Sequence, residues 1–209
     1  LASDIETIRG LCATHNVRFI VIDSVGSACM GEPESAEVVL RAFGALRSLG
    51  VSSLCIDHTN KEGTLFGSVY KYNASRQVFE CKKDQQPDDN KIVLGLFHKK
   101  ANNSRLMKPI GYELVFSDAT ITISRQDVRD TALETHMRVG DRIENLLKAK
   151  PGGMSVQEIA EELEKTESHI RKELSDGKRR GKFVVIGNNY ANAAFTSEID
   201  GAKITQWQL

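Results

Sequence analysis

The chain has 209 residues, and its 28 lysines and arginines balance 28 aspartates and glutamates. Hydrophobic residues make up 40% and charged residues 27%, which is the composition of an ordinary globular protein with one large domain or two small ones. No apolar run is long enough to span a membrane and no signal peptide is recognisable, so we expect a cytoplasmic protein that does not bind membranes.

The first 57 residues predict two parallel strands joined by a helix. A helix over residues 4–13 precedes a strand over 17–23, an apolar run that ends in the acidic side chain of Asp23. An amphipathic helix over 34–49 then leads to a second apolar strand over 51–57. Because a helical crossover joins strands that run in the same direction, these two should be parallel. Their continuous apolar runs are typical of strands buried on both faces.

The following residues predict an antiparallel extension of this sheet. A polar loop follows the second strand and enters a short helix near Ser68. Four further strands are expected over residues 77–82, 91–98, 111–116 and 119–124. Connections without a helix make neighbouring strands antiparallel. We therefore expect an α/β fold with one mixed sheet, in which a parallel core continues into antiparallel strands.

The last third of the chain predicts a small α+β domain over residues 139–209, which a polar linker over 126–138 joins to the first domain. Apolar residues at helical spacing indicate three helices, and the second opens with the capping box Ser155-Val-Gln-Glu158. Strands over 182–186 and 190–195 then form a hairpin. Three helices and a hairpin are typical of a winged helix-turn-helix, in which one helix enters the DNA major groove.

The third helix of this domain ends in a basic segment. Four cations occur within five residues, from Lys178 to Lys182, and each could neutralise a DNA phosphate. The residues expected to contact DNA from this domain are Ser168, His169, Arg171, Lys172, Lys178, Arg179, Arg180, Lys182, Asn188 and Tyr190. Two alternatives stay open: the domain could bind protein, and the basic residues could simply favour the negative end of a helix dipole.

The first 125 residues resemble the RecA-like P-loop ATPases, especially those of plasmid and phage replication helicases. The resemblance rests on four motifs that occur in order. They are Phe19-Ile-Val-Ile-Asp-Ser, which is similar to a Walker B strand, Ile56-Asp-His-Thr-Asn-Lys61, Gly67-Ser-Val-Tyr-Lys71 and His98-Lys-Lys-Ala-Asn-Asn103. The resemblance implies that residues 1–125 are the C-terminal part of a RecA-like ATPase domain. The complete protein would bind ATP and Mg²⁺ and act on DNA as a ring or filament of identical subunits.

The resemblance also implies roles for individual residues. Asp23 would position Mg²⁺ and Ser24 would support it, while His58 would sense the γ-phosphate. Lys100 would reach the nucleotide of a neighbouring subunit; the family's arginine two residues later is missing, and Arg105 is the nearest one. Ordinary alternatives remain: Asp23 could cap the turn after its strand, and His58 could be a surface histidine.

Residues 63–76 match a mobile loop through which members of this family contact DNA. Lys61, Lys71 and Arg76 would then contact phosphates of the DNA backbone. The alternative is a solvated loop that binds no ligand.

Parts that such an ATPase needs are missing from the 209 residues. They contain no Gly-x-x-x-x-Gly-Lys-Ser/Thr loop to hold the triphosphate, and the family's water-activating glutamate is also missing. Together with Leu1 as the first residue, this favours a truncated chain that hydrolyses no ATP and binds no cofactor tightly by itself. The alternative is a non-enzymatic winged-helix DNA-binding regulator whose α/β domain mediates oligomerisation.

Overall fold

A computed structural model describes residues 1–194 except positions 30, 33–34, 62, 64 and 66. The chain divides into two units: residues 1–79 with 98–107, and residues 80–97 with the chain from 108 onward. It is a mixed α/β protein with a parallel two-stranded sheet and an antiparallel four-stranded sheet, and the α/β class predicted from the sequence is thereby confirmed. Within the described residues, no helix is both long and apolar enough to cross a membrane.

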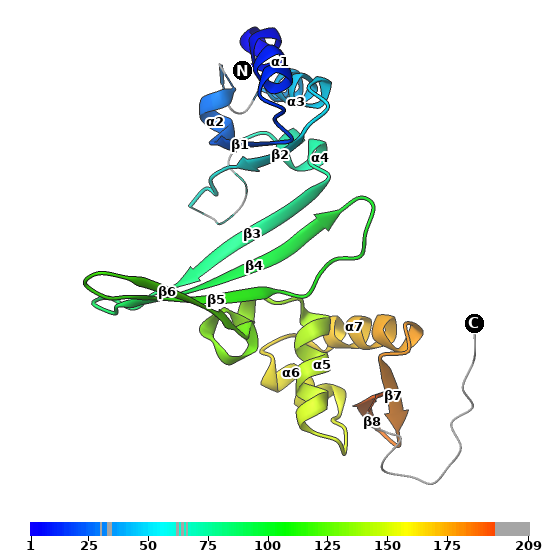
Figure 1. The fold of residues 1–209 in the computed structure, drawn as a ribbon. Coiled ribbons are helices and arrows are strands. Elements are labelled where there is room, and N and C mark those ends of the chain that lie inside the picture. Colours follow the sequence, from blue (N-terminus) through cyan, green and yellow to red (C-terminus); the bar gives the residue numbers. More distant parts are fainter. Residues whose placement is uncertain (30, 33–34, 62, 64, 66, 195–209) are drawn as a thin grey trace. The chain divides into compact units, whose positions relative to one another are not determined.

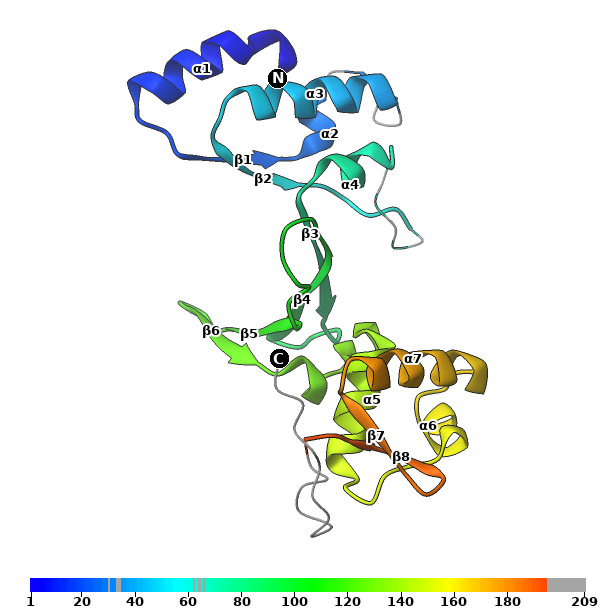
Figure 2. The same ribbon diagram turned by 90° about the vertical axis from the view of Figure 1, so that its right-hand side faces the viewer.

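The first unit contains the parallel sheet. Its elements are the 3-10 helix η1 (Ala2–Asp4), α1 (Ile5–Thr14), β1 (Phe19–Asp23), α2 (Val25–Ala28), α3 (Ala36–Ser48), β2 (Ser52–Ile56) and α4 (Tyr70–Ala74). Strand β1 pairs with β2 in parallel, with Val21 opposite Leu54, so the predicted parallel pair with a helical crossover is confirmed. The helices α1, α2 and α3 lie on one side of this sheet (Figures 1 and 2).

Helix α3 shows why the sequence folds locally in this way. The side chain of Ser35 accepts a hydrogen bond from the backbone N–H of Val38 at 3.4 Å and caps the first turn. The apolar positions of α3 are buried, namely Val39, Ala42, Phe43 and Leu46. Gly50 follows the helix with a φ of +70°, a conformation that glycine adopts without strain. The predicted start of this helix at position 34 lies outside the described residues.

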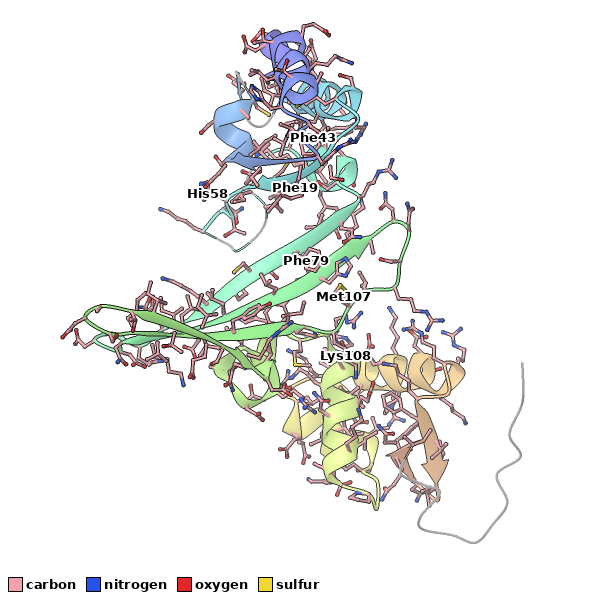
Figure 3. All side chains as sticks on the ribbon, viewed as in Figure 1. Phe19, Phe43, His58, Phe79, Met107 and Lys108 are labelled. Atoms are coloured by element: carbon pink, nitrogen blue, oxygen red, sulfur yellow. The ribbon has the colours of Figure 1, made fainter. Side chains whose placement is uncertain are left out.

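The prediction that both strands are buried on both faces is wrong. Phe19 and Val21 of β1 are 56% and 55% exposed, and Leu54 and Ile56 of β2 are 50% and 40% exposed. Figure 3 marks Phe43, on the helix side of the sheet, and Phe19, whose side chain is exposed. Alternate residues of a strand point to opposite faces, which explains the alternating exposure along β1. In the part of the chain that the structure describes, helices cover the face opposite Phe19, and Phe19 and Val21 lie on the other face.

The second sheet has the strand order β3-β4-β5-β6. Its strands are β3 (Gln77–Asp84), β4 (Lys91–Ala101), β5 (Ile110–Phe116) and β6 (Ile121–Gln126). Strand β5 pairs antiparallel with β4 and with β6. The expected single mixed sheet is therefore wrong: among the described strands, β2 hydrogen-bonds to β1, and the later strands form a sheet of their own. The boundary between the two units runs through β3 and β4.

The segment 126–138, expected to be a polar linker, contains two short 3-10 helices, η2 (Val128–Asp130) and η3 (Ala132–His136). Three of its apolar side chains are buried in a cluster with two residues of β4. The cluster consists of Val93, Phe97, Val128, Leu133 and Met137. The connection is therefore packed against the antiparallel sheet within the second unit.

Three helices and a hairpin follow (Figure 2). They are α5 (Val139–Ala149), α6 (Val156–Glu162), α7 (Glu167–Arg179), β7 (Phe183–Ile186) and β8 (Asn189–Asn192). We call residues 139–194 the helical module. Its largest fully buried side chains belong to the apolar positions at helical spacing that indicated the three helices, namely Ile143, Leu147, Ile159, Ile170 and Leu174. The predicted capping box is confirmed, because Ser155 and Glu158 exchange hydrogen bonds of 2.7 and 3.2 Å. Of the predicted hairpin, Phe195 lies outside the described residues.

Candidate functional sites

The first candidate site is the edge of the parallel sheet at which β1 and β2 end. Asp23 is the last residue of β1, is exposed, and lies opposite Ile56 in the strand register. His58 follows β2 by two residues and is exposed as well. Because the strands are parallel, their carboxyl ends meet at the same edge, and this is where ligands bind in open α/β sheets. Ser24 occupies the N-cap position of α2 and is half-buried, and the peptide bond between Asp23 and Ser24 is cis. The structure thus brings the three residues to one edge.

A buried ion pair lies beside this edge. The ammonium of Lys71 is 2.7 Å from Oδ2 of Asp57, and the two side chains are only 3% and 12% exposed. The other carboxylate oxygen of Asp57 accepts a hydrogen bond from the backbone N–H of His58 at 3.0 Å. The predicted contact of Lys71 with DNA phosphates would therefore require its buried ammonium to leave Asp57.

Lys100 is held by backbone carbonyls of its own unit. Its ammonium donates hydrogen bonds to the backbone carbonyls of Tyr72, Asn73 and Ser75 at 2.9, 2.9 and 2.8 Å. These carbonyls belong to the last turn of α4 and its end, where a cation is favoured by the helix dipole. In this conformation the ammonium is bound to these carbonyls, and the implied role as a finger toward a neighbouring subunit stays a prediction. Arg105, in the connection between β4 and β5, is exposed and has no ion pair among the described residues.

The predicted DNA-contacting loop begins near Lys61, which is exposed, and ends at Arg76, which is exposed too. Positions 64 and 66 of this loop lie outside the described residues. An isolated antiparallel bridge between Thr59 and Leu65 closes part of the loop. Lys61 and Arg76 remain accessible to a phosphate, whereas Lys71 does not.

The second candidate site is the exposed surface of α7 and the residues after it. Several of the predicted contacts are engaged within the module: Arg171 pairs with Glu167 at 2.8 Å, Arg179 pairs with Asp176, and Lys182 pairs with Glu144 at 2.8 Å. His169 lies 3.9 Å from Glu173, and the hydroxyl of Ser168 is 3.2 Å from that of Thr166. Of the predicted contacts on this surface, three exposed cations have no ion pair with the described residues, namely Lys172, Lys178 and Arg180. We call these three the free cations.

Of the two hairpin residues predicted to contact DNA, one is exposed and the other is half-buried. Asn188, in the turn between β7 and β8, is exposed. Tyr190 is half-buried and packs against the core of the module, and its backbone N–H donates to the carbonyl of Met154 at 2.8 Å. In this structure its ring therefore contributes to the packing of the module.

Glu144 is a residue of this surface that sequence reasoning missed. Burial raises the pKa of its carboxyl, but hydrogen bonds from Lys148 and Lys182 outweigh burial and lower the pKa to about 2. The carboxylate is therefore charged at neutral pH and ties Lys182 to α5. The only sequence signal was the spacing of Glu144 and Lys148, four residues apart on one helix.

Within the described residues, no cluster of three or more His, Cys, Asp or Glu side chains could hold a metal. The edge offers one exposed carboxylate, Asp23, and the sequence contains no phosphate loop. A scan against protein-family models and a search of curated proteins found no match to the chain.

Proposed function

We propose that the chain is part of a RecA-like ATPase of the plasmid and phage replication type, and that its helical module is a winged helix that binds DNA. The observation that carries the DNA-binding proposal is the set of free cations, Lys172, Lys178 and Arg180, on and just after α7. Cations that are exposed and unpaired are available to replace the counterions of a phosphate backbone.

Helix α7 would be the recognition helix of this winged helix. Its exposed Ser168, His169 and Lys172 would face the major groove, while Lys178 and Arg180 would contact phosphates at its end. The hairpin would be the wing, with Asn188 at its tip. Arg171, Arg179 and Lys182 would first have to leave their carboxylate partners, so we expect them to contribute less than the free cations.

The proposal for residues 1–125 is supported by the common edge of Asp23, Ser24 and His58. Asp23 would hold Mg²⁺ through its water shell, and His58 would lie where a γ-phosphate is sensed. Because these 209 residues include no phosphate loop, we expect no ATP hydrolysis by this chain alone. A phosphate-release assay that detected turnover, abolished in Asp23→Ala, would contradict this expectation.

DNA binding is tested by fluorescence anisotropy of a labelled duplex and a labelled single strand, titrated with the full chain. The salt concentration is varied between about 50 and 200 mM, because each phosphate contact adds about 0.9 to the slope of log K against log salt. We expect the double variant Lys178→Gln/Arg180→Gln to weaken binding to all sequences and to reduce this slope by about 2.

The matched control is Arg18→Gln/Lys83→Gln, which removes the same charge from exposed positions outside the module. It should leave the salt slope unchanged. The DNA-binding proposal is rejected if the chain does not bind DNA, or if the control weakens binding as much as the double variant.

A further inference from the structure

The second unit contains a cavity of about 290 Å³ that no role proposed above involves. Its walls are the start of β5, the end of β6, η2 and one face of α5. Known small-molecule sites begin at about 300 Å³, so this cavity has room for one small molecule and no more. The side chains on its walls indicate which chemistry such a molecule would have.

The carboxylates of the cavity wall are all neutralised by cations of the protein. Asp127 is paired with Arg129, and its pKa is lowered by the hydrogen bonds that it accepts from Arg129. Asp141 lies 2.7 Å from Arg138. Glu144 is paired with Lys148 and Lys182, as described above. None of the three therefore opposes an anionic ligand with an uncompensated charge.

Two cations of the wall, in contrast, have no such partner. Arg125 and Lys108 are exposed and form no ion pair with the described residues. The guanidinium carbon of Arg125 lies 4.7 Å from the centre of the Tyr112 ring, a cation–π contact that orients its planar fork. The wall itself holds three cations and three carboxylates, and among its cations Arg125 and Lys108 are the two without a carboxylate partner in the described part of the chain.

The wall also contains an unsatisfied hydrogen-bond donor. The amide nitrogen Nδ2 of Asn145 is buried and has no acceptor among the described residues. A buried donor without a partner costs about 1–3 kcal/mol, so native proteins usually satisfy it with a ligand, an ion or water. Because this nitrogen has almost no accessible surface, the Asn145 amide would have to turn toward the cavity to donate to an oxyanion there.

We propose that this cavity binds the phosphate group of a small phosphomonoester, with Arg125 and Lys108 pairing with its oxygens and Asn145 donating a hydrogen bond. A phosphomonoester carries about two negative charges at pH 7, which matches two unpaired cations better than a carboxylate does. The arginine fork binds such an oxyanion through two parallel hydrogen bonds. The volume suits a nucleoside monophosphate or a smaller ester, and the site is separate from the sheet edge of Asp23.

Calorimetric titration of the full chain tests the proposal with inorganic phosphate, adenosine monophosphate and acetate as probes. We expect both phosphates to bind saturably and acetate to bind at least about tenfold more weakly, since it carries one charge instead of two. Arg125→Gln should weaken phosphate binding by about tenfold or more, because a charge-assisted bidentate contact is lost. Lys108→Gln should weaken it by a smaller factor, because a single ammonium contact is lost.

Arg18→Gln, an exposed arginine of the first unit, is the matched control and should bind both phosphates as the unchanged chain does. Circular dichroism of Arg125→Gln should show an intact fold, since this side chain is exposed. The proposal is overturned if neither phosphate binds saturably, in which case water alone satisfies Asn145, or if Arg125→Gln binds as tightly as the control.

The phosphate group could belong to a free small molecule or to a DNA backbone, and competition separates the two. If a DNA duplex fails to displace adenosine monophosphate, the free ester is the ligand. If it displaces the nucleotide and Arg125→Gln weakens both, the backbone supplies the phosphate. Lys178→Gln/Arg180→Gln should retain nucleotide binding, so failure of the DNA-binding proposal would leave this result untouched.

Discussion

Two lysines that were expected to reach ligands hold α4 in place instead. Lys71, in its first turn, forms the buried ion pair with Asp57, and Lys100 donates to three carbonyls at its end. Neither role is visible in the sequence, because the groups that each lysine contacts lie at least 14 positions away along the chain and approach the lysine only when the unit folds. What the sequence could show was that the residues are lysines within motifs; which atoms they touch depends on tertiary contacts.

At this scale we predict that Lys71→Met lowers the free energy of unfolding by about 3–5 kcal/mol, because it leaves the buried Asp57 carboxylate without its partner. Replacing both residues, as Lys71→Met with Asp57→Leu, should cost less than Lys71→Met alone. Urea unfolding followed by circular dichroism measures the effect, and the exposed Lys83→Met, within about 0.5 kcal/mol of the unchanged chain, is the control. Breaking a buried ion pair usually costs about 3–5 kcal/mol, so a loss of less than about 1 kcal/mol would contradict the role assigned to the pair.

The stability of the protein in acid should depend on Glu144. The pKa of this carboxyl is about 2 in the folded chain, compared with 4.5 for an unperturbed glutamate. Because the folded value is the lower one, the stabilisation is complete above pH 4.5 and is lost as the pH falls toward 2. The full difference corresponds to at most about 3 kcal/mol.

The variant Glu144→Gln should therefore be less stable at neutral pH and should lose less stability between pH 4.5 and pH 2 than the unchanged chain. Urea midpoints across this pH range provide the measurement. Glu162→Gln, at an exposed position of α6, should follow the unchanged chain. Parallel pH curves for Glu144→Gln and the unchanged chain would show that the two lysines do not stabilise the carboxylate.

At the scale of elements, the close approach of α7 to β7 depends on a glycine. A β-carbon at Gly177 would lie 2.2 Å from a ring carbon of Phe183, which is itself buried. Helical periodicity located α3 within a few residues and indicated α5 and α7, because each has an amphipathic face that the sequence displays. Periodicity gave no indication that Gly177 contacts Phe183, because a glycine at this place in the sequence is equally typical of the end of a helix.

We predict opposite effects for alanine at two helical glycines. Gly177→Ala should destabilise the module by about 1–3 kcal/mol, because the added methyl group overpacks against Phe183. Gly44→Ala in α3, where nothing lies within 4 Å of the new atom, should stabilise the chain by up to about 1 kcal/mol through helix propensity. Thermal unfolding distinguishes the two variants, and stabilisation by both would show that α7 and β7 do not approach so closely.

For the molecule as a whole, local patterns predicted most elements but not how the strands are grouped. The parallel pair β1–β2 followed from its helical crossover, whereas the separation of β3–β6 into another sheet depends on hydrogen bonds between distant segments. The exposed apolar face of Phe19, Val21, Leu54 and Ile56 was also unexpected. A continuous apolar run in the sequence does not show whether one face of the strand or both faces are covered in the folded protein. The cavity beside α5 joins residues near 108, 125 and 145, so no local motif could reveal it.

The proposed function predicts where DNA would lie on the molecule, and hydrogen exchange of the full chain with and without duplex DNA measures this directly. Slower exchange on DNA addition should be confined to the amides of α7, β7 and β8, with the greatest change near Lys172 and Arg180. The double variant Lys178→Gln/Arg180→Gln should lose this protection. Unchanged exchange in α7, or protection confined to β1 and β2, would contradict a DNA-binding helical module.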